Sequence, residues 1–217
     1  MQQIKKPFLP IIMIFSGVIA GIAISIAIYM LTGFSFLSTV EQKKVTISVD
    51  AQNADVSMLA YTVLSYIRDD DYLALSRVVH PEFGVVLSPS ATINLTTDRR
   101  FSAEQIAVLD TDSNIYVWGV YNGSGEPIEL TPSEYFDKYI AAACHLDAAI
   151  IGVNQIVRSG NALENITDIF PNVKFVDFHI PGGEHSDDHD WRSLRLGFEE
   201  YEDSLRLIVI THSAWTD

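Results

Sequence analysis

The chain has 217 residues, of which 28 are acidic and 14 are basic, and its formal net charge is −14. This balance argues against a nucleic-acid-binding protein, because an acidic domain repels phosphates. The single cysteine, Cys144, excludes an intramolecular disulfide and any metal site made of several cysteines.

The first predicted element is a membrane-spanning helix. No charged residue lies between Lys6 and Glu41, and about 20 apolar residues are enough to cross the hydrocarbon core of a bilayer. A cleaved signal peptide is the alternative, but its apolar region normally has about 7–15 residues. We therefore predict a cytoplasmic tail over residues 1–7, a transmembrane signal-anchor helix over 8–32 and a juxtamembrane linker over 33–52.

The residues around and inside this segment predict its orientation. Lysines at 5–6 precede the helix, whereas lysines at 43–44 follow it next to an acidic residue. The positive-inside rule then favours a cytoplasmic N-terminus, with the C-terminal domain outside a bacterial cell membrane. Gly17 and Gly21 form a G-x-x-x-G pair, which predicts weak self-association of the helix.

Helices open the predicted soluble domain, residues 53–217. Apolar residues at helical spacing predict a helix over 54–68 with Asn53 as N-cap, and a short helix over 72–79 that the aspartates 69–71 cap. Two capping boxes, at Ser102 and at Thr131, predict two further helices.

Strands dominate the rest of the domain. Residues 115–121 and 127–130 flank a tight turn and predict a hairpin, and extended segments are expected over 84–87, 92–95 and 151–157. The last three expected strands have short links, which is typical of an antiparallel meander; they cover 173–180, 191–199 and 205–211. Helices that precede long strands indicate an α+β fold.

Several motifs in this domain are distinctive. They lie at residues 116–128, at 134–136, in the segment DWRSLRLGFEE at 190–200 and in the pair WT at 215–216. In these motifs the chain resembles a family of uncharacterised bacterial extracytoplasmic proteins, many of them lipoproteins, over roughly residues 54–217. The family has no assigned activity, so the resemblance implies a location at the cell envelope and no reaction.

The order of the elements also resembles the cystatin-like and NTF2-like folds. This resemblance implies helices that lie across a curved antiparallel sheet and enclose a conical pocket. Aromatic residues in the domain either line such an apolar pocket or simply fill the core. The candidate ligand-binding residues are Tyr61, Trp118, Tyr121, Phe178 and Trp215.

Three residues are candidates for acid–base chemistry. Asp177 and His179 alternate onto one face of their strand, and Arg195 lies on the neighbouring strand. If these side chains enter a pocket, a carboxylate beside a histidine or an arginine can transfer protons. The alternative is a cross-strand ion pair on a solvated face.

A histidine- and aspartate-rich loop is the candidate metal site. His185, Asp187 and His189 present imidazoles and a carboxylate, which suit Zn²⁺, Ni²⁺ or Cu²⁺. The alternative is a solvated acidic loop between two strands. No motif in the chain predicts a cofactor.

Two functional interpretations stay open. The first is a non-catalytic domain, anchored in the membrane, that binds a protein, a peptide or a small apolar ligand at the cell envelope. The second is an NTF2-like enzyme that acts on a small hydrophobic substrate with Asp177 and His179 as acid–base residues. The first is favoured, because no nucleophile motif accompanies these residues.

Overall fold

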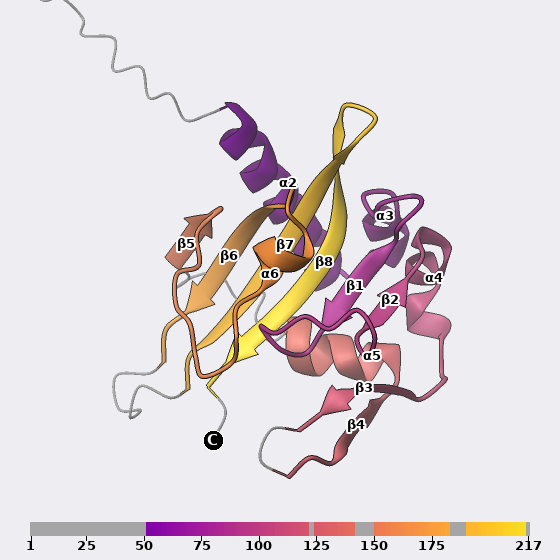
Figure 1. Ribbon diagram of the computed structural model, residues 1–217. Helices are drawn as coiled ribbons and strands as arrows, with labels where there is room; N and C mark the ends of the chain where they lie inside the picture. The colour runs from indigo at the N-terminus through magenta and orange to yellow at the C-terminus, as the bar shows by residue number, and fades with distance from the viewer. Residues whose placement is uncertain (1–50, 122–123, 142–149, 183–189, 216–217) are drawn as a thin grey trace, which may run out of the picture. The chain divides into compact units, whose positions relative to one another are not determined.

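The computed structural model describes residues 51–121, 124–141, 150–182 and 190–215, without the side chains of 51 and 52 (Figure 1). The chain divides into two units, residues 1–48 and 49–217, and every described residue belongs to the second. The predicted tail, anchor helix with Gly17 and Gly21, and most of the linker lie outside the described residues. Within the described ranges, no helix has the length and apolar character needed to cross a membrane.

The described unit has an α+β fold, as the order of the predicted elements indicated. Its helices are α2 (Ala51–Arg68), α3 (Tyr72–Ser76), α4 (Ala103–Ala107), the 3-10 helix η1 (Leu109–Thr111), α5 (Pro132–Tyr135), the π-helix η2 (Phe136–Ile140) and α6 (Ile166–Ile169). Its strands are β1 (Val85–Ser88), β2 (Arg99–Phe101), β3 (Tyr116–Val120), β4 (Pro127–Leu130), β5 (Ile150–Val153), β6 (Lys174–Ile180), β7 (Arg192–Tyr201) and β8 (Ser204–Ala214).

Six strands form one curved sheet in the order β2-β1-β8-β7-β6-β5, and β3 and β4 form a separate hairpin (Figure 1). The predicted meander of β6, β7 and β8 is confirmed, since each neighbouring pair is antiparallel. The expectation of a wholly antiparallel sheet is wrong, because β1 pairs with β8 in parallel. The two strands are far apart in sequence, so no short turn between them imposes opposite directions.

Local capping signals predicted several helix boundaries. Ser102 and Thr131 both form complete capping boxes, and the Asp71 side chain caps α3 by accepting from the Ala74 N–H at 2.9 Å. The assignment of Asn53 as N-cap is wrong. Helix α2 begins at Ala51, and the Asn53 side chain accepts a hydrogen bond from Asn154 instead, at 2.9 Å.

One predicted strand is absent and one strand was not predicted. Residues 92–95 form no strand, because the backbone N–H and C=O of Ile93 pair with the Asn165 side chain at 2.8 and 2.9 Å. Strand β2 was missed, since its sequence, RRF, has neither length nor alternation to indicate an extended edge.

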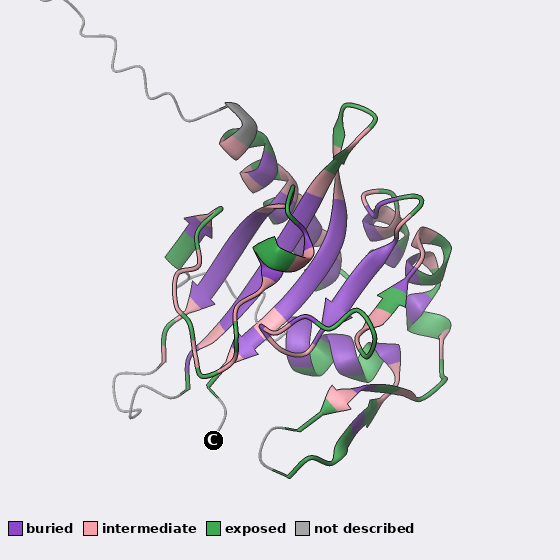
Figure 2. Ribbon diagram, viewed as in Figure 1, coloured by how far each residue is buried: buried purple, intermediate pink, exposed green. Residues whose placement is uncertain are grey.

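The two faces of the sheet are covered differently (Figure 2). On one face, α2 packs over β6, and the main apolar core includes Ala60, Phe178 and Leu196. On the other face, a largely irregular segment, residues 154–173 with α6, covers the strands, and Ile166 approaches Gly197 of β7. We call this segment the covering segment.

A row of polar residues crosses the second face. In the strand register Asp177 lies opposite Arg195, Arg195 opposite Thr211, and Thr211 opposite Ser88. Each of the four is at most 1% exposed. Buried polar groups are costly unless they are paired, so this row requires partners from above the sheet.

Candidate functional site

A pocket of about 240 Å³ lies at the carboxyl-terminal end of β8. Its walls come from the turn after β1, the β3–β4 hairpin, η2, the covering segment and the end of β8. The lining residues are Pro89, Ser90, Ala91, Val120, Tyr121, Ile128, Tyr139, Ala162, His212, Ser213 and Ala214. A drug-sized ligand usually takes about 300–1,000 Å³, so this pocket fits a group about the size of a single ring.

Irregular backbone supplies much of this lining. The register of the hairpin shifts between Val117 and Val120, at Gly119, whose φ of +142° favours glycine. Such a bulge redirects the side chains that follow it, here Val120 and Tyr121. The π-helix η2 supplies Tyr139. Bulges and π-helical turns occur frequently at functional sites, and here both contribute to one pocket.

His212 is the main polar group in the wall. Burial, with the nearby positive charge of Arg192, lowers the pKa of His212 to about 4, and a hydrogen bond to the Pro89 backbone works in the opposite direction. The imidazole is therefore neutral at pH 7, with one ring nitrogen as donor and the other as acceptor. The ring packs edge-on against Tyr139, with centroids 5.5 Å apart.

Tyr121 and Tyr139 bring two phenols to the pocket. Lys138 Nζ donates to Tyr121 Oη at 2.8 Å and lies 4.7 and 5.3 Å from the ring centroids of Tyr121 and Tyr139. The hydrogen bond to Tyr121 raises the pKa of Lys138, and burial raises the pKa of Tyr139. At neutral pH the Tyr139 phenol is thus protonated and the Lys138 ammonium is charged.

The five aromatic residues predicted to bind a ligand do not share one site. Tyr121 lines the pocket, whereas Trp118 and Phe178 are fully buried in the main core. Tyr61 is 44% exposed on α2 and contacts the edge of Phe178 at 5.5 Å. Trp215 is 37% exposed and is not part of the pocket lining.

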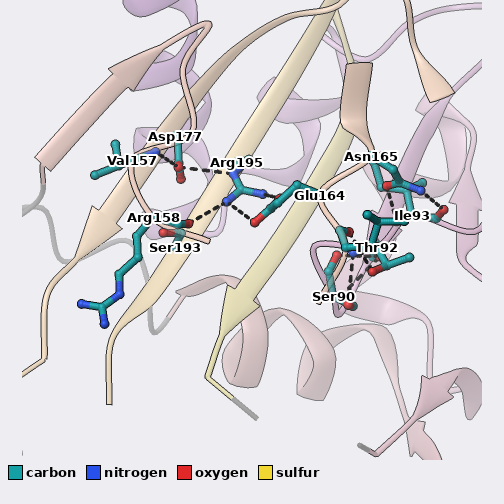
Figure 3. A network of polar contacts seen from close by, with 12 residues as sticks. Ser90, Thr92, Ile93, Val157, Arg158, Glu164, Asn165, Asp177, Ser193 and Arg195 are labelled. Atoms are coloured by element: carbon teal, nitrogen blue, oxygen red, sulfur yellow. Dashed lines mark hydrogen bonds and ion pairs between the residues drawn. The ribbon is translucent and has the colours of Figure 1, made fainter. Parts of the chain in front are cut away.

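The candidate acid–base residues lie in a buried ion-pair network (Figure 3). Both terminal nitrogens of Arg195 donate to the Glu164 carboxylate, and Nη2 also donates to the Arg158 carbonyl at 3.3 Å. Arg195 Nε lies 3.3 Å from Asp177 Oδ2, close enough for an ion pair but without the alignment of a hydrogen bond. Asp177 Oδ2 accepts from the Val157 N–H at 2.8 Å.

His179 does not join Asp177 and Arg195. Its Nδ1 lies 2.9 Å from Ser193 Oγ, and its ring packs on Trp191 at 5.5 Å. The predicted cross-strand pairing of Asp177 with Arg195 is present, but the pair does not lie on a solvated face as the structural alternative supposed. The covering segment buries it.

Two important residues were missed from the sequence. Glu164 lies in the covering segment, where no periodicity assigned it to the sheet. His212 could have been found from strand alternation, because it follows Ile210 by two positions and so lies on the same, apolar face of β8. A polar residue on the apolar face of a strand is a signal of a functional or specifically paired group. Tyr139, by contrast, belongs to the aromatic residues that were expected either to line a pocket or to fill the core, and it lies in the pocket wall.

The candidate metal residues His185, Asp187 and His189 lie outside the described residues. Within the part of the chain that the structure describes, no group of three or more histidine, cysteine, aspartate or glutamate side chains is arranged to hold a metal ion.

Comparisons with known proteins give little further information. No family model matches the chain, and no curated protein matches it. Among solved structures, the chain is similar to the crystal structure of a "Putative calcium/calmodulin dependent protein kinase II association domain" from Xanthomonas campestris. The two share 12% sequence identity and a TM-score of 0.28, over 73% of this chain and 84% of the other. A similarity this low assigns neither a fold family nor a function.

Proposed function

We propose that residues 53–217 form a non-catalytic binding domain, anchored at the outer face of a bacterial cell membrane by the helix predicted over 8–32. The domain binds a small, mainly apolar ligand or side chain. The observation that carries this proposal is the pocket of about 240 Å³, in which apolar walls such as Ile128 surround a few polar groups, among them His212. Ligand sites are typically concave, mostly apolar and equipped with a few polar groups that orient the ligand.

We further propose that the fold is of the NTF2-like or cystatin-like type. Helix α2 lies on one face of a curved sheet, and three consecutive antiparallel strands, β6, β7 and β8, form the centre of that sheet. In this arrangement a pocket at the strand ends is where a ligand would enter.

The acid–base alternative has weaker support. Asp177 is 0% exposed, and its Oδ2 atom already contacts both Arg195 and the Val157 N–H. A general base must reach the proton that it removes. Here the covering segment would have to move first, so the network serves better as a structural clamp than as a reactive centre.

Binding of a single-ring probe tests the pocket. The full chain in lipid nanodiscs is titrated with benzyl alcohol and followed by saturation-transfer NMR. Ala162→Phe fills the pocket from the covering segment, and Leu163→Phe, at a neighbouring position that is 69% exposed, is the matched control. We expect a saturable signal for the parent chain and for Leu163→Phe. Ala162→Phe should abolish this signal, because the added ring fills the pocket and leaves only partitioning of the probe into the lipid. Equal signals in all three proteins contradict the proposal.

The membrane orientation needs its own test. A periplasmic-type reporter enzyme fused to the C-terminus is active only outside the cytoplasmic membrane. We expect activity, and a reporter that works only in the cytoplasm contradicts the envelope location.

A further inference from the structure

Two cations lie next to the pocket in a chain whose net charge is −14. Lys138 lies on η2 beside Tyr139, and Arg192 lies on β7 directly opposite Ala214, which lines the pocket. Side chains opposite each other on paired strands leave the same face of the sheet. Arg192 therefore extends beside the wall that His212 and Ala214 form, close enough for its charge to act on His212.

No carboxylate of the described residues neutralises these two cations at the pocket. Lys138 donates to a phenol, Tyr121, and Nε of Arg192 is buried without a hydrogen-bond partner. The cations that act on His212 and Tyr139 are Arg192 and Lys138, respectively, and no described carboxylate is among the groups that shift the pKa of either residue. By contrast, the buried Arg195 has two carboxylates around it. A positive potential at the pocket is thus left for a ligand to neutralise.

The Lys138–Tyr121 pair also has the right chemistry for an anion. The ammonium donates to Tyr121 Oη at 2.8 Å, which polarises the phenol and makes its O–H a stronger donor, and Tyr139 lies close enough to share a hydrogen bond with the same phenol. An oxygen anion placed at the rim can accept from the phenol and lie near the ammonium. The apolar wall at Val120 and Ile128 can take a ring or a branched chain at the same time.

We propose that the ligand is a small carboxylate, with its carboxylate group at the Lys138–Tyr121 rim and its apolar body in the pocket. This inference rests on the proposed function and names the ligand class of the same pocket. A carboxylate fits better than a phosphate, because phosphate sites usually provide backbone N–H groups or several cationic donors around three oxygens. The rim provides one ammonium and one phenol.

Three probes of nearly equal shape and different charge test the inference: benzoate, benzamide and benzamidine. The full chain in nanodiscs is titrated with each, and the Ala162→Phe protein supplies the lipid blank. We expect benzoate to bind about threefold to tenfold more tightly than benzamide, because a charge-assisted contact at a partly exposed site contributes about that much. Benzamidine should bind most weakly, because its positive charge is repelled by the cations at the pocket. High salt should reduce the preference for benzoate, because the ammonium is at the surface.

Substitution of Lys138 tests whether the preference for benzoate over benzamide depends on this side chain. Lys138→Met keeps the length of the side chain and removes its charge, and Lys174→Met, at a surface depression elsewhere in the domain, is the matched control. We expect Lys138→Met to bring benzoate to the affinity of benzamide and to leave benzamide nearly unchanged, whereas Lys174→Met leaves the preference intact.

Two results would overturn the inference. If benzamide binds as tightly as benzoate and Ala162→Phe still blocks both, the carboxylate class is wrong and the binding pocket stands. If none of the three probes differs from the Ala162→Phe blank, both the ligand class and the proposed function fail.

Discussion

The two faces of the six-stranded sheet are both buried, but by different chemistry. On the α2 face, side chains such as Phe178, Leu194 and Leu196 pack against apolar helix residues. On the opposite face, the row that contains Asp177 and Arg195 is held by hydrogen bonds and ion pairs to the covering segment. Apolar burial is non-directional, whereas hydrogen bonds specify where a partner must be.

This difference explains how an irregular segment keeps a defined place. Residues 154–165 have little regular structure, so few backbone bonds to neighbouring strands position them. Polar contacts with the sheet position them instead (Figure 3). Asp177 accepts from the Val157 N–H, and Arg195 contacts the Arg158 carbonyl and the Glu164 carboxylate. The covering segment also places Ala162 in the pocket wall, so these hydrogen bonds and ion pairs help to define the shape of the candidate site.

Removal of the central cation should have the largest effect. Arg195→Met leaves the carboxylates of Asp177 and Glu164 buried without a counter-charge, and we expect it to lower the free energy of unfolding by about 3–5 kcal/mol. Urea denaturation of the full chain in mild detergent measures this. Adding Asp177→Asn and Glu164→Gln to the same protein should restore most of the loss, since no unpaired charge remains. A loss below about 1 kcal/mol would show that the network is not a clamp.

A cavity on the α2 face of the sheet should lower the free energy of unfolding slightly less than the loss of Arg195. Neutralising the two carboxylates should not restore this loss. Leu196 is fully buried next to Arg195 in the chain but faces α2. Leu196→Ala should lower the free energy of unfolding by about 3 kcal/mol in the same measurement, because it removes apolar contacts and leaves a void. The Asp177→Asn and Glu164→Gln changes should not offset it. If they do, the two faces are not independent.

Acid should weaken the pocket end of the sheet. The pKa of His212 is about 4 in the folded chain against an ordinary 6.5, so the unfolded chain takes up this proton first as the pH falls. The stability contribution is complete above pH 6.5 and is lost as the pH falls from 6.5 to about 4, by about 2–3 kcal/mol. Urea titrations at pH 7 and pH 4 should show a smaller difference for His212→Asn than for the parent chain. The same difference in both proteins would contradict the assignment.

The smallest expected effect tests how closely the covering segment approaches the sheet. A Cβ atom at Gly197 would lie 2.5 Å from Val209 Cγ1 and 2.9 Å from Val173 Cγ2. Gly197→Ala should therefore cost about 1–2 kcal/mol of overpacking. Val173→Ala in the same chain should relieve part of the crowding. A neutral Gly197→Ala would mean that the segment lies less tightly on the sheet than the apolar face does on α2.

Much of the secondary structure could be predicted because its signals are local. The capping boxes at Ser102 and Thr131 and the alternation along β6 and β7 depend on neighbouring residues alone. The parallel pairing of β1 with β8 could not, since strands without a short connection have no local signal of direction. The predicted anchor over 8–32 and metal loop over 185–189 lie outside the described residues, so they stay predictions.

The candidate site shows the same division. The sequence alone determined that Asp177 lies on the same face of its strand as His179, because side chains alternate with a period of two, and it offered Asp177 with Arg195 only as a candidate ion pair. Only the tertiary structure decided that this pair is buried and that the pocket lies beside His212 and Tyr139. The reason is physical: burial and cavities depend on segments distant in sequence that pack above a strand, and those segments carry no periodicity that points to their partners.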